Sequence, residues 1–229
     1  MSLVTLRKKL IPCSVIALSL FHMDWALAAA DERAEQVASM YLSTMVNGDI
    51  EEAKKLNDAL RSMFEGQDAF DINALKELPD SMASDLTEQL MQQFSDKQKA
   101  ALKTPVTDFT HALVAAILRS KCTVQGSDVS DNDAQEGNKI AAIRYACQVP
   151  DVANKVRALT KKIGKKPLSA AYFTELTSIY QNAPLAGSVK GSANLYSGEK
   201  AGEWFTGSPN ELSTPVVEAL AGPLIKGAK

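Results

Sequence analysis

The chain has 229 residues, of which 45% are hydrophobic and 23% are charged, and its formal net charge is −2 at neutral pH. This length and composition suit one folded domain with a substantial hydrophobic core, and no internal repeat or long low-complexity segment is present. The slight excess of acidic residues gives no electrostatic reason to expect nucleic acid as a partner.

The start of the sequence has the pattern of a cleaved secretory signal peptide. Basic residues precede an apolar run over residues 10–21, and small residues then place the cleavage site near Ala28 or Ala30. The run is too short to span a bilayer, which takes about 20 residues. Cys13 lies near the start of the run, whereas a lipid anchor needs a cysteine at its end. We therefore expect residues 1–28 to be removed and the protein to be periplasmic or secreted, and not membrane-spanning.

The remaining chain, residues 29–229, is predicted to form a single α+β domain. It is expected to be mainly helical, with about four antiparallel strands in two hairpins and one cross-strand disulfide. Three of the 25 basic residues and one of the 27 acidic residues precede Ala29, which leaves 22 basic and 26 acidic residues. The predicted parts are a helical stretch over 31–121, a hairpin over 122–149, helices over 151–182, strands over 188–206, and a C-terminal helix and tail over 213–229.

The helical stretch opens with an apolar stripe at helical spacing over residues 31–46, followed by the stop signal Asn47-Gly48 and the N-cap Asp49. The segment VASMYLSTMVNGDIEEAKKLNDAL resembles the first helical hairpin of exported nuclear-transport-factor-like and cystatin-like domains. The resemblance implies a pocket between a sheet and helices that binds a small molecule or a protein, and it transfers no catalytic residue. The chain departs from that pattern because two more helices precede its first clear strand.

Further along the helical stretch, residues 65–85 show mixed polarity and predict a loop with short helical pieces. Helices are predicted over 85–102 and 105–121, the second starting at Thr104-Pro105, since proline suits the first helical position. Asp151 is the predicted cap of a helix that ends at Gly164. Beyond these, we predict a helix over 169–182, strands over 188–196 and 203–206, and a last helix capped by Thr214.

Cys122 and Cys147 enclose a segment that is typical of a β-hairpin. If the two cysteines pair, the turn centre falls between Ala134 and Gln135 in the turn-forming letters DNDAQEGN. The same register pairs Val124 with Tyr145, Gly126 with Ile143, and Asp128 with Ala141, and it gives an apolar face near the base. A disulfide here closes a loop of about 26 residues and stabilises the fold by roughly 3 kcal/mol. A redox pair and a metal site are the alternatives, but the first favours C-x-x-C spacing and the second needs further ligands.

Residues with catalytic potential are few. His111 is the one histidine after the signal segment, and it falls within a predicted helix, where a boundary role is more common than catalysis. Acidic residues are numerous, but no spacing marks two of them as a catalytic pair. The sequence shows no phosphate-binding glycine loop and no helical zinc motif, so we expect no metal and no cofactor.

Charge is unevenly distributed along the chain. Residues 31–96 carry fifteen acidic and five basic residues, whereas DVANKVRALTKKIGKKP is strongly basic. Cations near a helix C-terminus complement its dipole, which accounts for part of this pattern. The alternatives are a docking patch for an anionic partner and neutralisation by the acidic third of the chain itself. The basic residues are Lys155, Arg157, Lys161, Lys162, Lys165 and Lys166.

Tyr196, Trp204 and Phe205 form an aromatic cluster near the last strands. One side of this cluster is expected to join the core, and a tryptophan flanked by glycines near a sheet edge is also a candidate contact anchor. Taken together, these features predict a non-catalytic binding or protein-interaction protein, such as an inhibitor or immunity-like partner. Its expected partner is a protein or an anionic surface in the periplasm. The alternatives are a small-ligand or lipid carrier with an apolar pocket and a carboxylate-dependent hydrolase.

Overall fold

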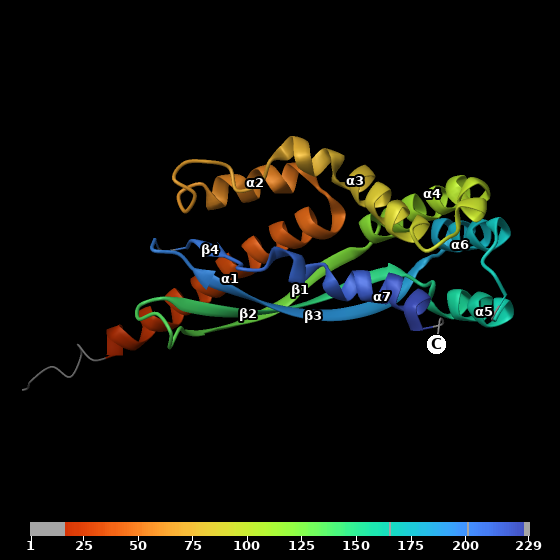
Figure 1. The fold of residues 1–229 in the computed structure, drawn as a ribbon. Helices are drawn as coiled ribbons and strands as arrows, with labels where there is room; N and C mark the ends of the chain where they lie inside the picture. Colours follow the sequence, from red (N-terminus) through yellow and green to blue (C-terminus); the bar gives the residue numbers. More distant parts are fainter. Residues whose placement is uncertain (1–16, 165, 201, 227–229) are drawn as a thin grey trace, which may run out of the picture.

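We describe the fold from a computed structural model that covers residues 17–164, 166–200 and 202–226, with side chains from residue 32 to residue 224. Most of the predicted signal peptide lies outside these residues. The elements, labelled in Figure 1, are α1 (Ala17–Asn47), α2 (Ile50–Leu60), α3 (Ile72–Met91), α4 (Asp96–Leu118), β1 (Lys121–Asp131), β2 (Lys139–Pro150), α5 (Ala153–Ile163), α6 (Ala170–Asn182), β3 (Leu185–Ser197), β4 (Trp204–Phe205), the 3₁₀ turn η1 (Pro209–Leu212) and α7 (Thr214–Lys226).

The fold is α+β, as predicted, with one antiparallel sheet in the order β1-β2-β3-β4. The pairs β1–β2 and β3–β4 are the two predicted hairpins. β2 also pairs with β3 along almost its whole length, although α5 and α6 separate the two strands in the sequence. The three long strands therefore form a continuous sheet that the short β4 extends at one end.

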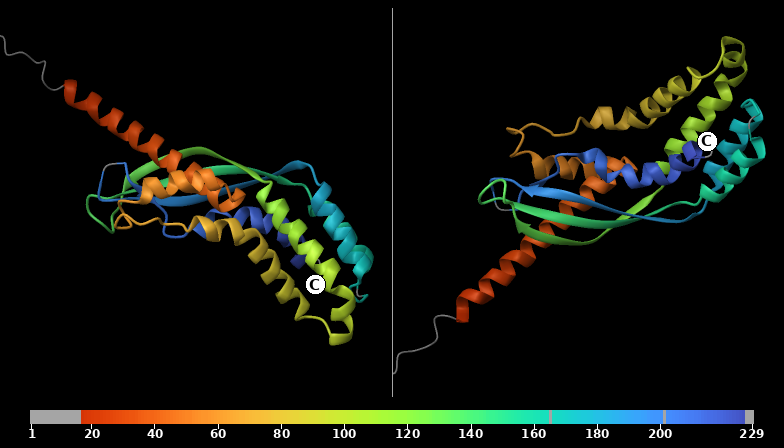
Figure 2. Two further views of the ribbon diagram at one scale, coloured as in Figure 1. Left: turned by 90° about the horizontal axis from the view of Figure 1, so that it is seen from above. Right: turned by 60° about the horizontal axis from the view of Figure 1, so that its bottom comes forward.

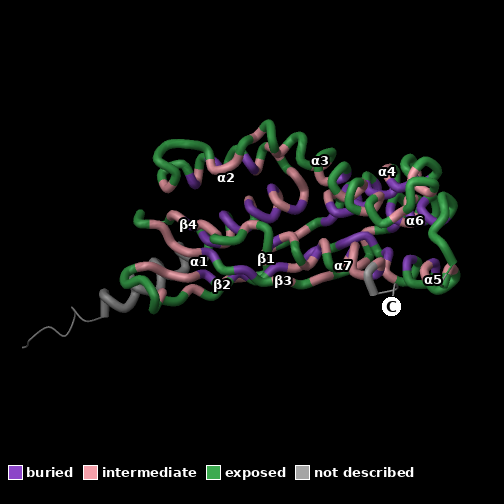
Figure 3. Tube along the Cα trace, in the orientation of Figure 1, coloured by how far each residue is buried: buried purple, intermediate pink, exposed green. Residues whose placement is uncertain are grey.

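The helices lie on one face of the sheet and beyond one of its ends, as Figures 1 and 2 show. α1 packs against β1, and α7 packs against β2 and β3. α3 packs on α4, while α4 and α6 pack together past the ends of the strands. In Figure 3 buried residues run along the described parts of α1 and α4 and recur along the strands. Alternation of buried and exposed residues along β2 and β3 matches a sheet with one solvated face.

Two tyrosine hydroxyl groups connect this framework to the C-terminal segment. The Tyr145 hydroxyl donates to the Leu212 carbonyl at 2.9 Å, and the Tyr180 hydroxyl donates to the Leu220 carbonyl at 2.6 Å. Tyr145 lies opposite Gly191 on β3, where the missing side chain leaves room for the ring. Since a buried hydroxyl group needs a partner, both bonds favour one fixed position for η1 and α7.

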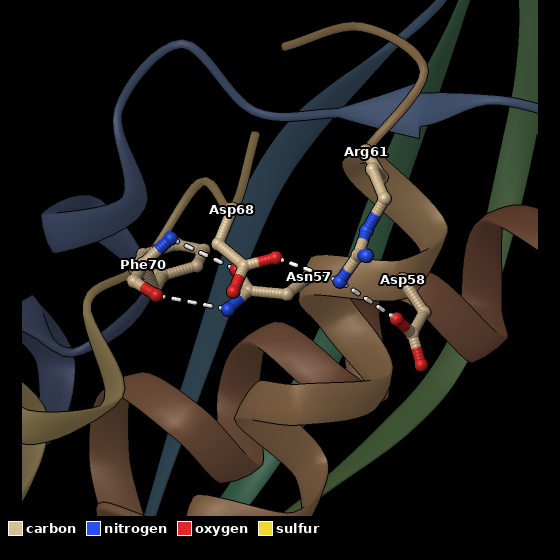
Figure 4. Close-up of polar contacts among 5 residues, drawn as sticks. All are labelled: Asn57, Asp58, Arg61, Asp68 and Phe70. Carbon is tan, nitrogen blue, oxygen red and sulfur yellow. Dashed lines mark hydrogen bonds and ion pairs between the residues drawn. The ribbon is translucent and has the colours of Figure 1, made fainter. Parts of the chain in front are cut away.

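Asn57 holds the loop between α2 and α3, as Figure 4 shows. Its buried amide donates to the Phe70 carbonyl and accepts from the Phe70 N–H, both at 2.8 Å. Arg61 lies between Asp58 and Asp68 on the exposed side of the same loop, at 3.2 and 2.8 Å. The paired amide bonds satisfy both backbone groups of Phe70, so this segment needs no regular secondary structure at that point.

The prediction for residues 65–102 was wrong in its helix boundaries. α3 starts at Ile72, where Asp71 caps it by accepting from the N–H groups of Asn73 and Ala74. Pro79 lies inside α3, and it interrupts the apolar pattern that would otherwise have revealed the helix. The helix is also lightly buried, with Ala83 as its one fully buried described residue, which weakens the periodic signal.

The predicted break at Thr104-Pro105 does not exist, because α4 runs without interruption from Asp96 to Leu118. Its N-cap is Ser95, whose backbone N–H and hydroxyl both donate to the Gln98 side chain. A proline inside a helix removes one backbone hydrogen bond. The buried residues of α4 continue on both sides of Pro105, with Leu102 before it and Val106 after it, and this packing keeps the helix continuous.

The hairpin register was right at the base and wrong toward the tip. Cys122 pairs with Cys147 as predicted, and a disulfide joins them. A β-bulge between Val124 and Gly126 then shifts the pairing by one residue, so Gly126 faces Arg144 instead of Ile143. Gly126 has φ +146°, a conformation that other residues rarely adopt. Because of the extra residue, Val129 faces the core side of the sheet and is half-buried. The bulge therefore explains why the alternation of apolar and polar residues in β1 breaks toward the tip.

Two helix caps also differ from the prediction. The N-cap of α5 is Val152, one residue after Asp151, and no side chain caps this helix. The Asp151 N–H donates to the Pro184 carbonyl at the end of the sheet. α7 begins at Thr214, whose hydroxyl donates back to the Asn210 carbonyl instead of accepting from the first turn.

Candidate functional site

An apolar cavity of about 420 Å³ lies at the helical end of the molecule, and we call it the helical-end cavity. Its walls come from the α3–α4 turn, the middle of α4, the end of α5, the start of α6 and α7. These segments meet there because the connection between β2 and β3 carries α5 and α6, and α6 packs against α4 while α5 packs against α6 and α7. The volume lies within the range of about 300–1,000 Å³ that is usual for small-molecule sites.

Aromatic rings form one wall of the cavity, with Phe173 at the centre. Its ring centroid lies 6.1 Å from that of Phe94, 5.9 Å from that of Phe109 and 5.3 Å from that of Tyr172. On α6 the buried Tyr172, Phe173, Leu176 and Tyr180 fall on one side of the helix. These residues belong to the helix predicted over 169–182, and each of the four is at most 7% exposed, so the aromatic wall is packed mainly against neighbouring side chains.

Few polar groups face this cavity. Among the described residues of its lining, Lys166 is the one that is charged and none carries a carboxylate, while Gln93, Thr160 and Tyr172 are polar. The Thr160 hydroxyl is already used, since it donates to the Val156 carbonyl at 2.9 Å. The Tyr172 hydroxyl makes no hydrogen bond to any residue that the structure describes. α5 ends at Gly164, whose φ of +60° turns the chain so that Lys166 returns to the cavity mouth.

The predicted basic segment lies on the exposed side of α5 and in the turn after it. Lys162 lies 3.9 Å from Glu175 on α6, and Arg157 donates to the Asn154 side chain at 3.1 Å. Lys155, Lys161 and Lys166 form no ion pair with a described residue. The described ion pairs include none between this segment and residues 31–96, so neutralisation by the acidic third is not observed. Lys165 lies outside the described residues.

The predicted aromatic contact cluster divides between core and surface. The side chain of Trp204 is only 3% exposed and belongs to the core, which rules it out as an accessible anchor in this conformation. Tyr196 and Phe205 face each other across β3 and β4 with ring centroids 6.0 Å apart, and both are half-buried. Neither ring contributes to the helical-end cavity.

The residues with catalytic potential are not assembled into a catalytic arrangement. His111 is exposed on α4, with Nδ1 at 4.0 Å from the Asp80 carboxylate. No group of three or more metal-ligating side chains occurs among the residues described. The pKa of Glu203 is lowered, chiefly by a hydrogen bond from Ser62, and this carboxylate lies far from the cavity on the β3–β4 turn.

A second, more open depression of about 750 Å³ lies where α1, the end of α4 and the α6–β3 junction meet. Two of its polar side chains have partners within the protein. The Asn47 amide donates to the Leu118 and Ser120 carbonyls, and Arg119 donates to the Tyr180 and Gln181 carbonyls. These bonds connect α1, α4 and the end of α6 at the depression.

Comparison with protein-family models, with curated proteins and with solved structures finds no match to this chain. The resemblance of the N-terminal helical hairpin to nuclear-transport-factor-like and cystatin-like domains therefore stays a prediction. Within the described part of the chain, no helix has the length and apolar character needed to cross a membrane.

Proposed function

We propose that the protein is a non-catalytic binding protein and that the helical-end cavity holds an apolar small molecule. The observation that carries this proposal is the aromatic wall around Phe173, which borders an unfilled volume of about 420 Å³. Large apolar side chains normally interdigitate and leave few voids wider than a water molecule. An apolar volume of this size, with one charged residue in its lining, is typical of a binding site.

The proposed site of action is an oxidising compartment outside the cytoplasm. The signal-like start of the sequence supports this location, as does the Cys122–Cys147 disulfide, because such bonds persist mainly in exported proteins.

Binding of the neutral apolar fluorophore phenylnaphthylamine to the mature protein tests the proposal. Leu90 lines the cavity from α3, and Leu86 lies one helical turn earlier, is also half-buried, and is outside the lining. Leu90→Trp should fill the cavity and weaken binding at least tenfold, whereas Leu86→Trp should leave binding unchanged. Thermal unfolding of both variants checks that they are folded. Absence of saturable binding to the wild type, or equal binding to the two variants, would overturn the proposal.

A second candidate function is contact with an anionic protein through the exposed side of α5. The observation in its favour is that Lys155 and Lys161 have no ion-pair partner among the described residues. Replacing both lysines by Gln should weaken such an association and reduce its dependence on salt. An association that is unaffected by the double replacement would remove this candidate.

A further inference from the structure

We propose that the natural ligand of the helical-end cavity is a free single-chain amphiphile with an anionic head, of the fatty-acid class. In this arrangement the acyl chain lies against the aromatic wall and the carboxylate lies at Lys166. The inference rests on the proposed function and specifies the ligand of the same site.

The lining of the cavity determines the polarity of its ligand. Most lining side chains are apolar, with Gln93, Thr160 and Tyr172 as polar members, and Lys166 is the one charged residue among the described lining residues. Lys166 is exposed, where the chain turns after α5. A purely apolar ligand would leave this ammonium group unused, and a cationic ligand would be repelled by it. An apolar chain ending in an anion is complementary to both parts of the site.

The surroundings of the mouth favour an anion as well. Lys161 and Lys162 belong to the last turn of α5, and Glu175 on α6 is the ion-pair partner of Lys162. The C-terminal end of α5 and the N-terminal end of α6 both lie at the mouth. The first carries a partial negative charge and the second a partial positive charge, so the two helix ends offset each other. The lysines therefore set the sign of the local charge.

The volume of the cavity favours one chain over two. About 420 Å³ falls in the lower part of the range of roughly 300–1,000 Å³ for small-molecule sites. A phospholipid would have to place two acyl chains in this space. We therefore assign the cavity to a free amphiphile and not to a lipid that stays in a bilayer.

Displacement of phenylnaphthylamine by dodecanoate and by dodecanol isolates the head group, because the two molecules have the same chain. Dodecanoate should compete about fivefold better than dodecanol for the wild type, the gain expected of one exposed ion pair. Lys166→Gln should remove this preference and leave dodecanol binding unchanged. Lys190→Gln is the matched control, since Lys190 is an exposed lysine on β3, away from the cavity. Decanoate should bind about fourfold more weakly than dodecanoate for each methylene that it lacks.

The possible results distinguish failure of this inference from failure of the proposed function. If neither amphiphile displaces the fluorophore and the fluorophore itself does not bind, the proposed function fails. If dodecanol competes as well as dodecanoate, or if Lys166→Gln keeps the preference, the cavity stands and the anionic assignment is overturned. Binding to anionic phospholipid vesicles without competition by dodecanoate would overturn the choice of a free ligand.

Discussion

Gly191 offers the sharpest test of how the sheet holds the C-terminal segment. A Cβ atom at this position would lie 2.2 Å from Cζ of Tyr145, whereas ordinary van der Waals contact begins near 3.4 Å. The ring cannot move freely, because it is buried and its hydroxyl donates to the Leu212 carbonyl. Gly191→Ala should therefore destabilise the protein, while Gly207→Ala, where nothing lies within 4 Å of the added methyl group, should not.

The expected loss of unfolding free energy combines two effects. Overpacking of a core costs about 1–3 kcal/mol, and loss of the tyrosine hydrogen bond adds about 1 kcal/mol. For a domain of this size, a loss of about 3 kcal/mol lowers Tm by roughly 6–12 °C. Gly207→Ala should stay within about 0.5 kcal/mol of the wild type.

Urea unfolding in two backgrounds assigns the effect to the ring. In a Tyr145→Leu background the methyl group of Gly191→Ala meets no phenol ring, so its additional cost should fall below about 1 kcal/mol. The reasoning is refuted if Gly191→Ala unfolds at the same urea concentration as Gly207→Ala. It is also refuted if Gly191→Ala costs as much in the Tyr145→Leu background as in the wild type.

Three other perturbations have defined outcomes. Replacing Cys122 and Cys147 together by Ala should lower the free energy of unfolding by about 3 kcal/mol, measured by urea unfolding, and the difference should vanish when the wild type is unfolded under reducing conditions. Asn57→Ala leaves both backbone groups of Phe70 unpaired and should cost about 2–3 kcal/mol in the same assay, whereas an unchanged midpoint would contradict the pairing. Burial raises the pKa of Tyr180 above its usual value of about 10, so the neutral phenol is favoured in the folded state. The contribution of Tyr180 to the free energy of unfolding is complete below about pH 10. As the pH rises further, this contribution should fall by about 1.4 kcal/mol per pH unit. Tyr180→Phe should remove that part of the dependence of stability on pH.

The elements with dense periodic patterns could be predicted from the sequence, and those with interrupted patterns could not. The helix predicted over 169–182 corresponds to α6, whose buried residues share one side and whose N-cap is Ser169. Both hairpins were predicted from turn-forming residues between the strands. Pro105 was predicted to start a helix, but it lies inside α4, where buried residues continue on both sides of it. Pro79 lies inside α3, whose light burial leaves no clear apolar stripe in the sequence. The bulge at Gly126 was missed because the polar tip of the hairpin has no apolar face to fix the register.

The cavity could not be predicted in this way. The sequence places most of its residues in helices, but it does not show that a cavity lies between them. Phe109 and Phe173 lie in the helices predicted over 105–121 and 169–182, and Lys166 was part of the basic segment. Periodicity shows which face of a helix turns inward, but not how closely two inward faces approach. That spacing depends on the crossing of helices that are distant in sequence, and no pattern within a single chain encodes it directly.

The two tyrosine bonds to the C-terminal segment tie one wall of the cavity to the sheet and to α6. Leu224 on α7 lies at one side of the cavity, and the segment that carries it is held through the Leu212 and Leu220 carbonyls. Phe94 and Phe109 pack on Phe173 independently of α7. A truncation before η1 would therefore remove Leu224 and both carbonyl acceptors, while leaving the aromatic contacts and the disulfide-linked hairpin in place.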